Sequence, residues 1–174
     1  MPGMEFRTTS VERTVALGER IGCAAARLSG SICLALHGNL GAGKTQLTRG
    51  IALGAGVVDP TLVASPTYVL LNVYQAGDRA RDGESKTVYH MDAYRIASEE
   101  DFDAVGFEEL LAADGILVVE WAEKVLHLLP EDRVEITIEP GEADDERIIG
   151  IDPRGATSEA LAREIAVAPG IKKD

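Results

Sequence analysis

The chain has 174 residues, of which 45% are hydrophobic and 26% are charged, and its formal net charge is −12. This composition is ordinary for a soluble globular protein, and we expect one domain over residues 1–174. Because acidic residues outnumber basic ones 29 to 17, tight and direct binding to nucleic acid is not expected. No apolar run is long enough to span a bilayer and the N-terminus lacks the apolar core of a signal peptide, so a cytoplasmic protein without a membrane partner is predicted.

The first predicted elements are a short edge strand at residues 5–10, a helix and a buried strand. Ser10 is placed to cap the helix, which we expect to run to about Leu28 with one apolar face. Residues 31–37 then form an apolar strand. Cys33 in this strand and Cys23 in the helix match no metal or disulfide pattern, so both are expected to be buried thiols in a reducing compartment.

A complete G-x-x-x-x-G-K-[ST] motif follows this strand and precedes a helix that is expected to end near Leu53. Its glycines let successive N–H groups converge on phosphates, and the start of the helix adds donors and the positive end of its dipole. Lys44 supplies a charge for the terminal phosphates, and the hydroxyl of Thr45 is placed to bind Mg²⁺. The motif therefore predicts a nucleotide site made by Gly38, Gly41, Ala42, Gly43, Lys44, Thr45 and Gln46.

The middle of the chain alternates between short strands and polar segments. Pro66 keeps Ser65 extended, so residues 65–67 are predicted to be a loop that enters a strand ending near Tyr74. Residues 75–86 are polar and glycine-containing, which predicts a solvated loop of the hairpin type. The following strand, residues 87–91, ends at Asp92.

An acidic helix at residues 99–105 is predicted next, with Ser98 as its cap and Gly106 separating it from residues 107–111. Residues 115–119 are a continuous apolar strand that is closed by Glu120. A short helix is expected at residues 122–129.

The last third of the chain changes pattern. Residues 133–139 alternate strictly between polar and apolar, and residues 147–151 do so in part, which predicts an antiparallel hairpin at the edge of the sheet. A closing helix is expected at residues 157–168, followed by a frayed tail at 169–174. The predicted fold is therefore α/β, a P-loop NTPase-like three-layer sandwich with a mostly parallel central sheet and this C-terminal antiparallel hairpin.

Two carboxylates are predicted to lie beside the phosphate loop. Ligands in open α/β sheets bind beyond the carboxyl ends of the strands, and both Asp92 and Glu120 follow a strand there. Phosphate-loop enzymes use such acids to hold the metal ion or to orient the attacking water. The structural alternatives are a surface acid for Glu120 and a cap on backbone N–H groups for Asp92. His90 is interpreted as a packed neighbour of Asp92, and Trp121 as a core residue.

Several segments together resemble the TsaE (YjeE) family of bacterial ATPases, which assist synthesis of the threonylcarbamoyladenosine modification of tRNA. They occur in the family's order over roughly residues 10–150 and are Leu40-Gly41-Ala42-Gly43-Lys44-Thr45, Ser65-Pro66-Thr67-Tyr68, His90-Met91-Asp92-Ala93-Tyr94-Arg95, Gly106-Phe107-Glu108-Glu109, Val119-Glu120-Trp121 and Leu129-Pro130. The resemblance implies an ATPase that uses ATP and Mg²⁺ and acts with the threonylcarbamoyl transferase TsaD and its relative TsaB. Asn39 departs from the acid that is common in the family's loop.

The resemblance also implies roles for individual residues. Thr45 and Glu120 look like the Mg²⁺ ligands, Asp92 like the acid needed for hydrolysis, and Thr67 like part of a switch-like loop. Thr9 and Arg147 align loosely with positions that touch the nucleotide.

Two other functions remain open at this point. A small-molecule kinase would need an arginine-bearing lid, for which only Arg79 and Arg81 are available in the loop 75–86. A non-catalytic switch would bind the nucleotide without turning it over. A GTPase is disfavoured because the chain has no N-K-x-D motif.

Overall fold

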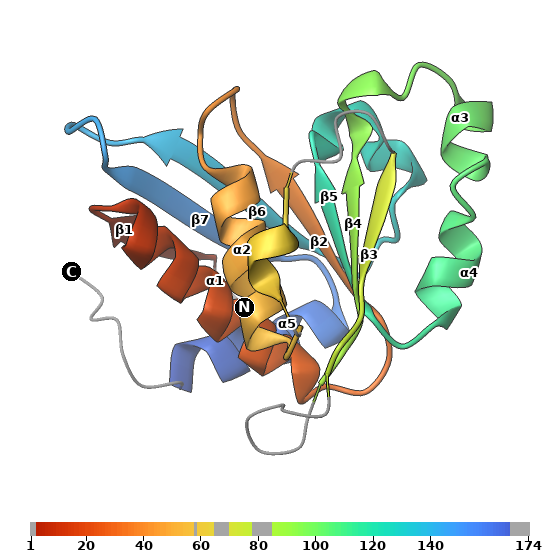
Figure 1. The fold of residues 1–174 in the computed structure, drawn as a ribbon, viewed down its shortest axis with the longest axis horizontal. Helices are drawn as coiled ribbons and strands as arrows, with labels where there is room; N and C mark the ends of the chain where they lie inside the picture. The colour runs from red at the N-terminus through yellow and green to blue at the C-terminus, as the bar shows by residue number, and fades with distance from the viewer. Residues whose placement is uncertain (1–2, 58, 65–69, 78–84, 168–174) are drawn as a thin grey trace.

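The computed structural model describes residues 3–57, 59–64, 70–77 and 85–167, which form an α/β fold around one seven-stranded sheet (Figure 1). The strand order is β1-β7-β6-β2-β5-β4-β3. The strands β6, β2, β5 and β4 are mutually parallel, whereas β7, β1 and β3 run antiparallel to their neighbours. The strands are β1 (Met4–Thr8), β2 (Ile32–His37), β3 (Leu71–Tyr74), β4 (Val88–Asp92), β5 (Ile116–Glu120), β6 (Val134–Pro140) and β7 (Arg147–Pro153).

Helices cover both faces of the sheet, because the central strands are apolar on both sides. On β2, Leu34 and Leu36 join a core with α1, α2 and α5, while Cys33 and Ala35 join a second core with α3 and α4. The predicted three-layer α/β architecture with a mostly parallel centre is therefore confirmed. The helices are α1 (Val11–Ala26), α2 (Lys44–Gly54), α3 (Glu99–Asp103), α4 (Phe107–Ala112) and α5 (Ala156–Val167), with 3-10 turns η1 (Pro60–Leu62), η3 (Ala93–Arg95), η4 (Ala122–Lys124) and η5 (Leu126–Leu128).

The helices α1 and α2 pack with their backbones in direct contact through glycines spaced four residues apart on each helix. A Cβ added at Gly50 would lie 2.1 Å from the carbonyl oxygen of Val15, and one at Gly22 would lie 2.1 Å from that of Ile51. Gly18 and Gly54 face backbone atoms in the same way. The helix that carries the phosphate loop is thus held against α1 at a distance that no larger residue permits.

Most element boundaries agree with the expectations, and Ser10 caps α1 by accepting a hydrogen bond from the Arg13 N–H. Cys33 is buried as expected, whereas Cys23 on α1 is only partly buried. Two expectations about the elements are wrong. Residues 122–129 form two 3-10 turns, η4 and η5, because the backbone leaves helical geometry at Val125. The hairpin β6–β7 does not lie at the edge of the sheet, because β1 pairs with β7 and takes the edge position itself. The tail at 169–174 and most of the loop 75–86 lie outside the described residues.

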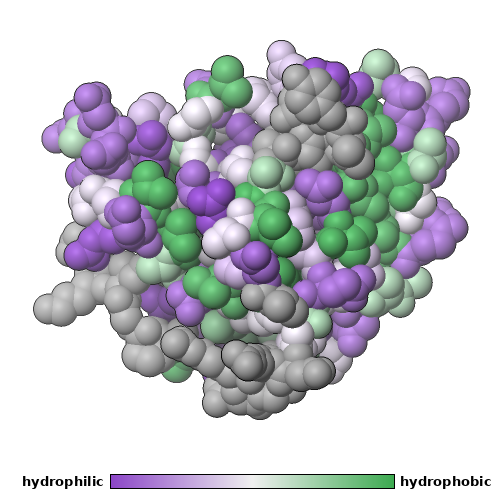
Figure 2. Space-filling model, viewed as in Figure 1, coloured by the Kyte–Doolittle hydropathy of each residue, from purple (hydrophilic) through white to green (hydrophobic). Residues whose placement is uncertain are grey.

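The face that carries α1 and α2 has a mixed surface. In Figure 2 hydrophilic residues dominate toward both sides of this face, and hydrophobic residues gather between them. Leu53 on α2 and Leu62 on η1 are among the exposed apolar side chains. No helix in the described ranges is both long enough and apolar enough to cross a membrane.

Candidate functional site: a phosphate loop facing two strand-end carboxylates

The candidate site lies where three parallel strands end together. In the register of the sheet Glu120 on β5 pairs with Leu36 on one side and with Asp92 on the other. Val118 on β5 and Val88 on β4 point into the core beneath α1 and α2, so the period-2 alternation sends Glu120, His90 and Asp92 to that same side. The phosphate loop leaves β2 on this side, which explains how residues far apart in sequence meet.

The backbone of the loop has the conformation that a phosphate cradle requires. Gly41 and Gly43 have φ of 78° and 108°, in the left-handed region that favours glycine, and a Cβ at either position would point into open space. Gly43 precedes α2 without a side-chain cap. The N–H groups at the start of α2 are therefore not covered by a capping side chain, and together with the helix dipole they can receive an anion.

Lys44 is folded back onto the loop. Its Nζ donates hydrogen bonds to the carbonyl oxygens of Gly38 at 2.6 Å and Asn39 at 3.1 Å, and it lies 3.9 Å from the centroid of the Trp121 ring. Burial lowers the pKa of Lys44, an effect that the carboxylates of Glu120, Glu123 and Asp92 oppose. Bound phosphates would add further negative charge and favour the protonated ammonium.

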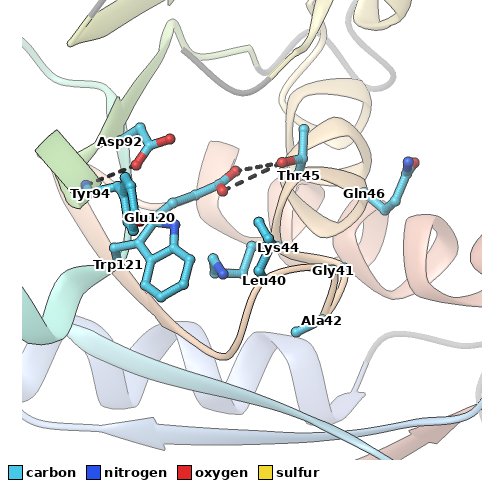
Figure 3. Close-up of a pocket in the computed structure, with 11 residues that line it drawn as sticks. Leu40, Gly41, Ala42, Lys44, Thr45, Gln46, Asp92, Tyr94, Glu120 and Trp121 are labelled. Atoms are coloured by element: carbon cyan, nitrogen blue, oxygen red, sulfur yellow. Dashed lines mark hydrogen bonds between the residues drawn. The ribbon is translucent and has the colours of Figure 1, made fainter. Parts of the chain in front are cut away.

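Thr45 and Glu120 are in direct contact across the cavity. The Thr45 hydroxyl is 3.1 Å from Oε1 and 3.4 Å from Oε2 of Glu120, a carboxylate that is only 3% exposed (Figure 3). The surface-acid alternative for Glu120 is therefore wrong. Glu120 points at the phosphate loop from the opposite wall.

The residues present suit a magnesium ion that is bound together with a nucleotide. Among the described residues no group of three His, Cys, Asp or Glu side chains could hold a metal ion alone. Mg²⁺, however, is commonly bound by one or two protein oxygens, with phosphates and water supplying the rest. The Thr45 hydroxyl and the Glu120 carboxylate are such a donor pair at the start of α2.

Asp92 is placed for both of the roles that were considered for it, a backbone cap and a residue of the site. Its Oδ1 accepts a hydrogen bond of 2.9 Å from the Tyr94 N–H, so it caps η3, and the side chain also lines the cavity. The capping role is therefore observed, and a role in hydrolysis stays a prediction that this position permits.

The cavity between the loop and the strand ends has a volume of about 530 Å³, within the range of small-molecule sites. Its walls combine the phosphate loop with the ends of β4 and β5. It is lined by Leu40, Gly41, Ala42, Gly43, Lys44, Thr45, Gln46, Asp92, Tyr94, Glu120 and Trp121.

Three predicted site residues, Gly38, Arg147 and Thr9, do not line the cavity. Gly38 is at the base of the loop, where a Cβ would lie 2.7 Å from the Ile138 carbonyl oxygen. Arg147 on β7 donates from Nε to the carbonyl oxygen of Ala42 at 2.9 Å, so it contacts the loop from behind. Thr9 is exposed just after β1 and is not among the cavity-lining residues, and Thr67 lies outside the described residues.

Two features of the site were not foreseen. His90, interpreted as a packed neighbour, is fully buried with Nε2 2.9 Å from Oε1 of Glu120. Trp121, interpreted as a core residue, packs against the core that α3 and α4 cover and also lines the cavity. Its φ of 56° is rare for a bulky residue and turns the chain sharply after β5. Tyr94 packs on the same ring at a centroid distance of 5.1 Å. The H-x-D spacing on β4 was the available signal for His90, because it puts both side chains on one face.

Comparison with known proteins gives one consistent result. The family described as "Threonylcarbamoyl adenosine biosynthesis protein TsaE" matches residues 8–149. Proteins named "tRNA threonylcarbamoyladenosine biosynthesis protein TsaE" are similar over much of the chain. The one from Bacillus subtilis is 34% identical and the alignment covers 95% of this chain and 96% of the relative, and the one from Mycobacterium leprae is 36% identical, with 79% and 83% covered. The crystal structure of B. subtilis YdiB superposes with a TM-score of 0.73 at 30% identity over 95% of both chains.

Proposed function

The chain belongs to the TsaE family, and we propose that it is an Mg²⁺-dependent ATPase that assists a threonylcarbamoyl transferase complex in forming threonylcarbamoyladenosine in tRNA. The observation that carries the proposal is the contact of Glu120 with Thr45 of the lysine-bearing phosphate loop, across a cavity of about 530 Å³. Relatives named for this biosynthesis support the pathway.

The residues of the loop bind the nucleotide in this proposal. The N–H groups at the start of α2 receive the phosphates, and the Lys44 ammonium exchanges the carbonyl oxygens of Gly38 and Asn39 for phosphate oxygens. Thr45 and Glu120 would hold Mg²⁺, which when bound would neutralise charge that develops on the phosphates. Asp92, beside Glu120 in the register, orients the attacking water.

The protein partners in this proposal are TsaD and TsaB. The cavity has no arginine among its described lining residues, and Arg147 uses its guanidinium on backbone carbonyls. An arginine that stabilises the transition state can increase the rate by about 10³ or more, and a partner can supply it. The net charge of −12 favours a basic protein surface over tRNA as the direct contact.

The test is multiple-turnover phosphate release from ATP without an added acceptor. We expect slow release by the chain alone, little change with tRNA, and strong stimulation by the TsaB–TsaD pair from the same organism. Release only with a small-molecule acceptor would indicate a kinase instead. ATP binding without release under every condition would indicate a non-catalytic switch.

A further inference from the structure

His90 is the buried neighbour of the proposed metal ligand. It lies on β4, two residues before Asp92, and its side chain is 0% exposed. Its Nε2 is 2.9 Å from Oε1 of Glu120, and the ring of Tyr74 on β3 packs beside it at a centroid distance of 6.2 Å. The imidazole is therefore enclosed, and its polar contact is directed at one oxygen of one carboxylate.

The chemistry of this contact fixes which nitrogen carries the proton. An ionised carboxylate can only accept hydrogen bonds, so Nε2 of His90 must be the donor. In the neutral ring Nδ1 is then an acceptor, and it has no hydrogen-bond partner among the described residues. A buried acceptor without a partner is destabilising, and an apolar residue of similar size would avoid that cost. Packing alone therefore does not account for a histidine here.

The contact also distinguishes the two carboxylate oxygens of Glu120 from each other. Thr45 reaches both Oε1 and Oε2, whereas the recorded contact of His90 is with Oε1. A carboxylate on the last residue of a strand can rotate about its side-chain torsions, and a donor at Oε1 restricts that rotation. Outer hydrogen bonds of this kind orient metal ligands.

We propose that His90 is a positioning residue that holds the Glu120 carboxylate in the orientation needed for Mg²⁺, without binding the metal itself. The inference rests on the proposed function, because it assigns a role around the same metal. Mg²⁺ prefers oxygen ligands, which agrees with a histidine that serves the carboxylate.

Two variants test whether Mg²⁺ binding requires the hydrogen bond to Glu120 or merely a polar side chain at position 90. In His90→Gln the amide nitrogen occupies about the place of Nε2 and can still donate to Glu120, whereas in His90→Asn the shorter side chain places its amide near Nδ1. His127→Asn is the matched control, because its side chain is 64% exposed and contacts Glu99 at 3.5 Å. ATP binding is titrated by calorimetry over a series of Mg²⁺ concentrations and in EDTA.

We expect the Mg²⁺ concentration for half-maximal enhancement of ATP binding to rise about 10–100-fold in His90→Asn, and to stay near wild type in His90→Gln and His127→Asn. ATP affinity in EDTA should be the same in all four proteins. Equal Mg²⁺ dependence in His90→Asn and wild type would overturn the inference and leave the proposed function intact. If ATP binding by the wild-type protein does not depend on Mg²⁺, both the inference and the proposed function are overturned.

A measurement on the wild-type chain keeps the inference testable if His90→Asn does not fold. The chain has three histidines, so substituting His37 and His127 in turn assigns the remaining ring ¹⁵N signals to His90 without a change at His90 itself. We expect His90 to carry its proton on Nε2, with and without Mg²⁺ and ATP. A ring that is protonated on Nδ1 and bare at Nε2 could not donate to Glu120 and would overturn the inference.

Discussion

The ammonium of Lys44 lies 3.9 Å from the centroid of the Trp121 ring while it donates to the carbonyl oxygens of Gly38 and Asn39. When nucleotide is bound, a phosphate-loop lysine contacts the phosphate oxygens instead. The same charge therefore has two sets of partners that it cannot serve together. Binding of ATP should move Lys44 from one set to the other.

Lys44→Ala is expected to weaken ATP binding about 10–100-fold, because a hydrogen bond to a charged group contributes about 1.5–3 kcal/mol. The fold should persist, since alanine is a good helix former at the start of α2. Calorimetric titration measures the affinity, and circular dichroism checks the fold. Arg163→Ala is the control, because that side chain pairs with Glu159 on α5, does not line the cavity and should leave the affinity unchanged. Undiminished affinity in Lys44→Ala would contradict the assignment of the loop.

Trp121 should report the movement of Lys44 directly. It is the single tryptophan of the chain, so the emission on excitation at its absorption band comes from the ring that Lys44 covers. We expect ATP to shift or quench this emission in the wild type. In Lys44→Ala the spectrum should already differ before ATP is added, because the cation has gone. Identical spectra for the two proteins without nucleotide would show that the lysine does not lie on the ring in solution.

Substitutions of Glu120 and Asp92 are expected to affect different steps, Mg²⁺-dependent binding for Glu120 and turnover for Asp92. Glu120→Gln should weaken the Mg²⁺-dependent part of ATP binding by at least the roughly 10–100-fold typical of losing an outer-shell partner, because a neutral amide is a poor ligand for a hard cation. Asp92→Asn should retain ATP binding and lose about 10²–10⁴ in turnover with the partner proteins, the range of a general base.

Stability distinguishes the two functions of Asp92. Asparagine also caps helices well, so Asp92→Asn should keep the hydrogen bond from the Tyr94 N–H, whereas Asp92→Ala should lose about 1 kcal/mol in the free energy of unfolding. Normal turnover in a stable Asp92→Asn protein would leave capping as the sole role of this residue.

Cys33 should give the chain a measurable alkaline pH dependence. Burial in β2 raises the pKa of the Cys33 thiol to about 12, although Arg133 slightly lowers it. The folded state therefore keeps a proton that the unfolded chain releases above about pH 9, so this contribution to stability is complete below pH 9 and is lost as the pH rises toward 12. Urea unfolding from pH 8 to 10.5 should show a shallower loss of stability in Cys33→Ala than in wild type. Equal slopes would mean that the thiol is accessible to solvent.

Gly50→Ala should destabilise the protein although alanine is the better helix former. Helix propensity alone predicts a gain of about 1 kcal/mol, but the added Cβ would lie 2.1 Å from the carbonyl oxygen of Val15. Overpacking typically costs about 1–3 kcal/mol, and here it involves backbone that cannot change rotamer, so we expect a net loss of at least about 1 kcal/mol by urea unfolding. Ala166→Gly on an exposed position of α5 is the control, since it measures propensity without a contact. A more stable Gly50→Ala protein would show that the helices are farther apart than described.

The elements and the phosphate loop could be predicted from the sequence because each depends on local pattern. Continuous apolar runs gave the parallel strands, and Ser10 and Ser98 marked helix starts that the structure bears out. The position of the β6–β7 hairpin could not be predicted, because it depends on the long-range pairing of β1 with β7. The break at Val125 was missed because a short apolar segment with helical residues does not reveal a change of backbone angle.

The parts of the site that were missed arise from contacts between segments far apart in the chain. The order His-x-Asp on β4 and the acid closing β5 were visible, but the register that brings His90 to Glu120 requires β4 to lie next to β5. The place of Trp121 depends on a left-handed backbone at a residue type that rarely adopts it. Hydrophobicity alone suggests a core position for such a side chain.

The glycine contact between α1 and α2 limits how this protein can change over evolution. A clash between two side chains can be relieved by a smaller residue on the opposite helix, so pairs of positions can drift together. At Gly50 and Gly22 the opposing atoms are the carbonyl oxygens of Val15 and Ile51, which every amino acid possesses. No compensating substitution at position 15 or 51 can make room, and the four glycines must therefore persist individually for as long as the phosphate loop stays seated on α1.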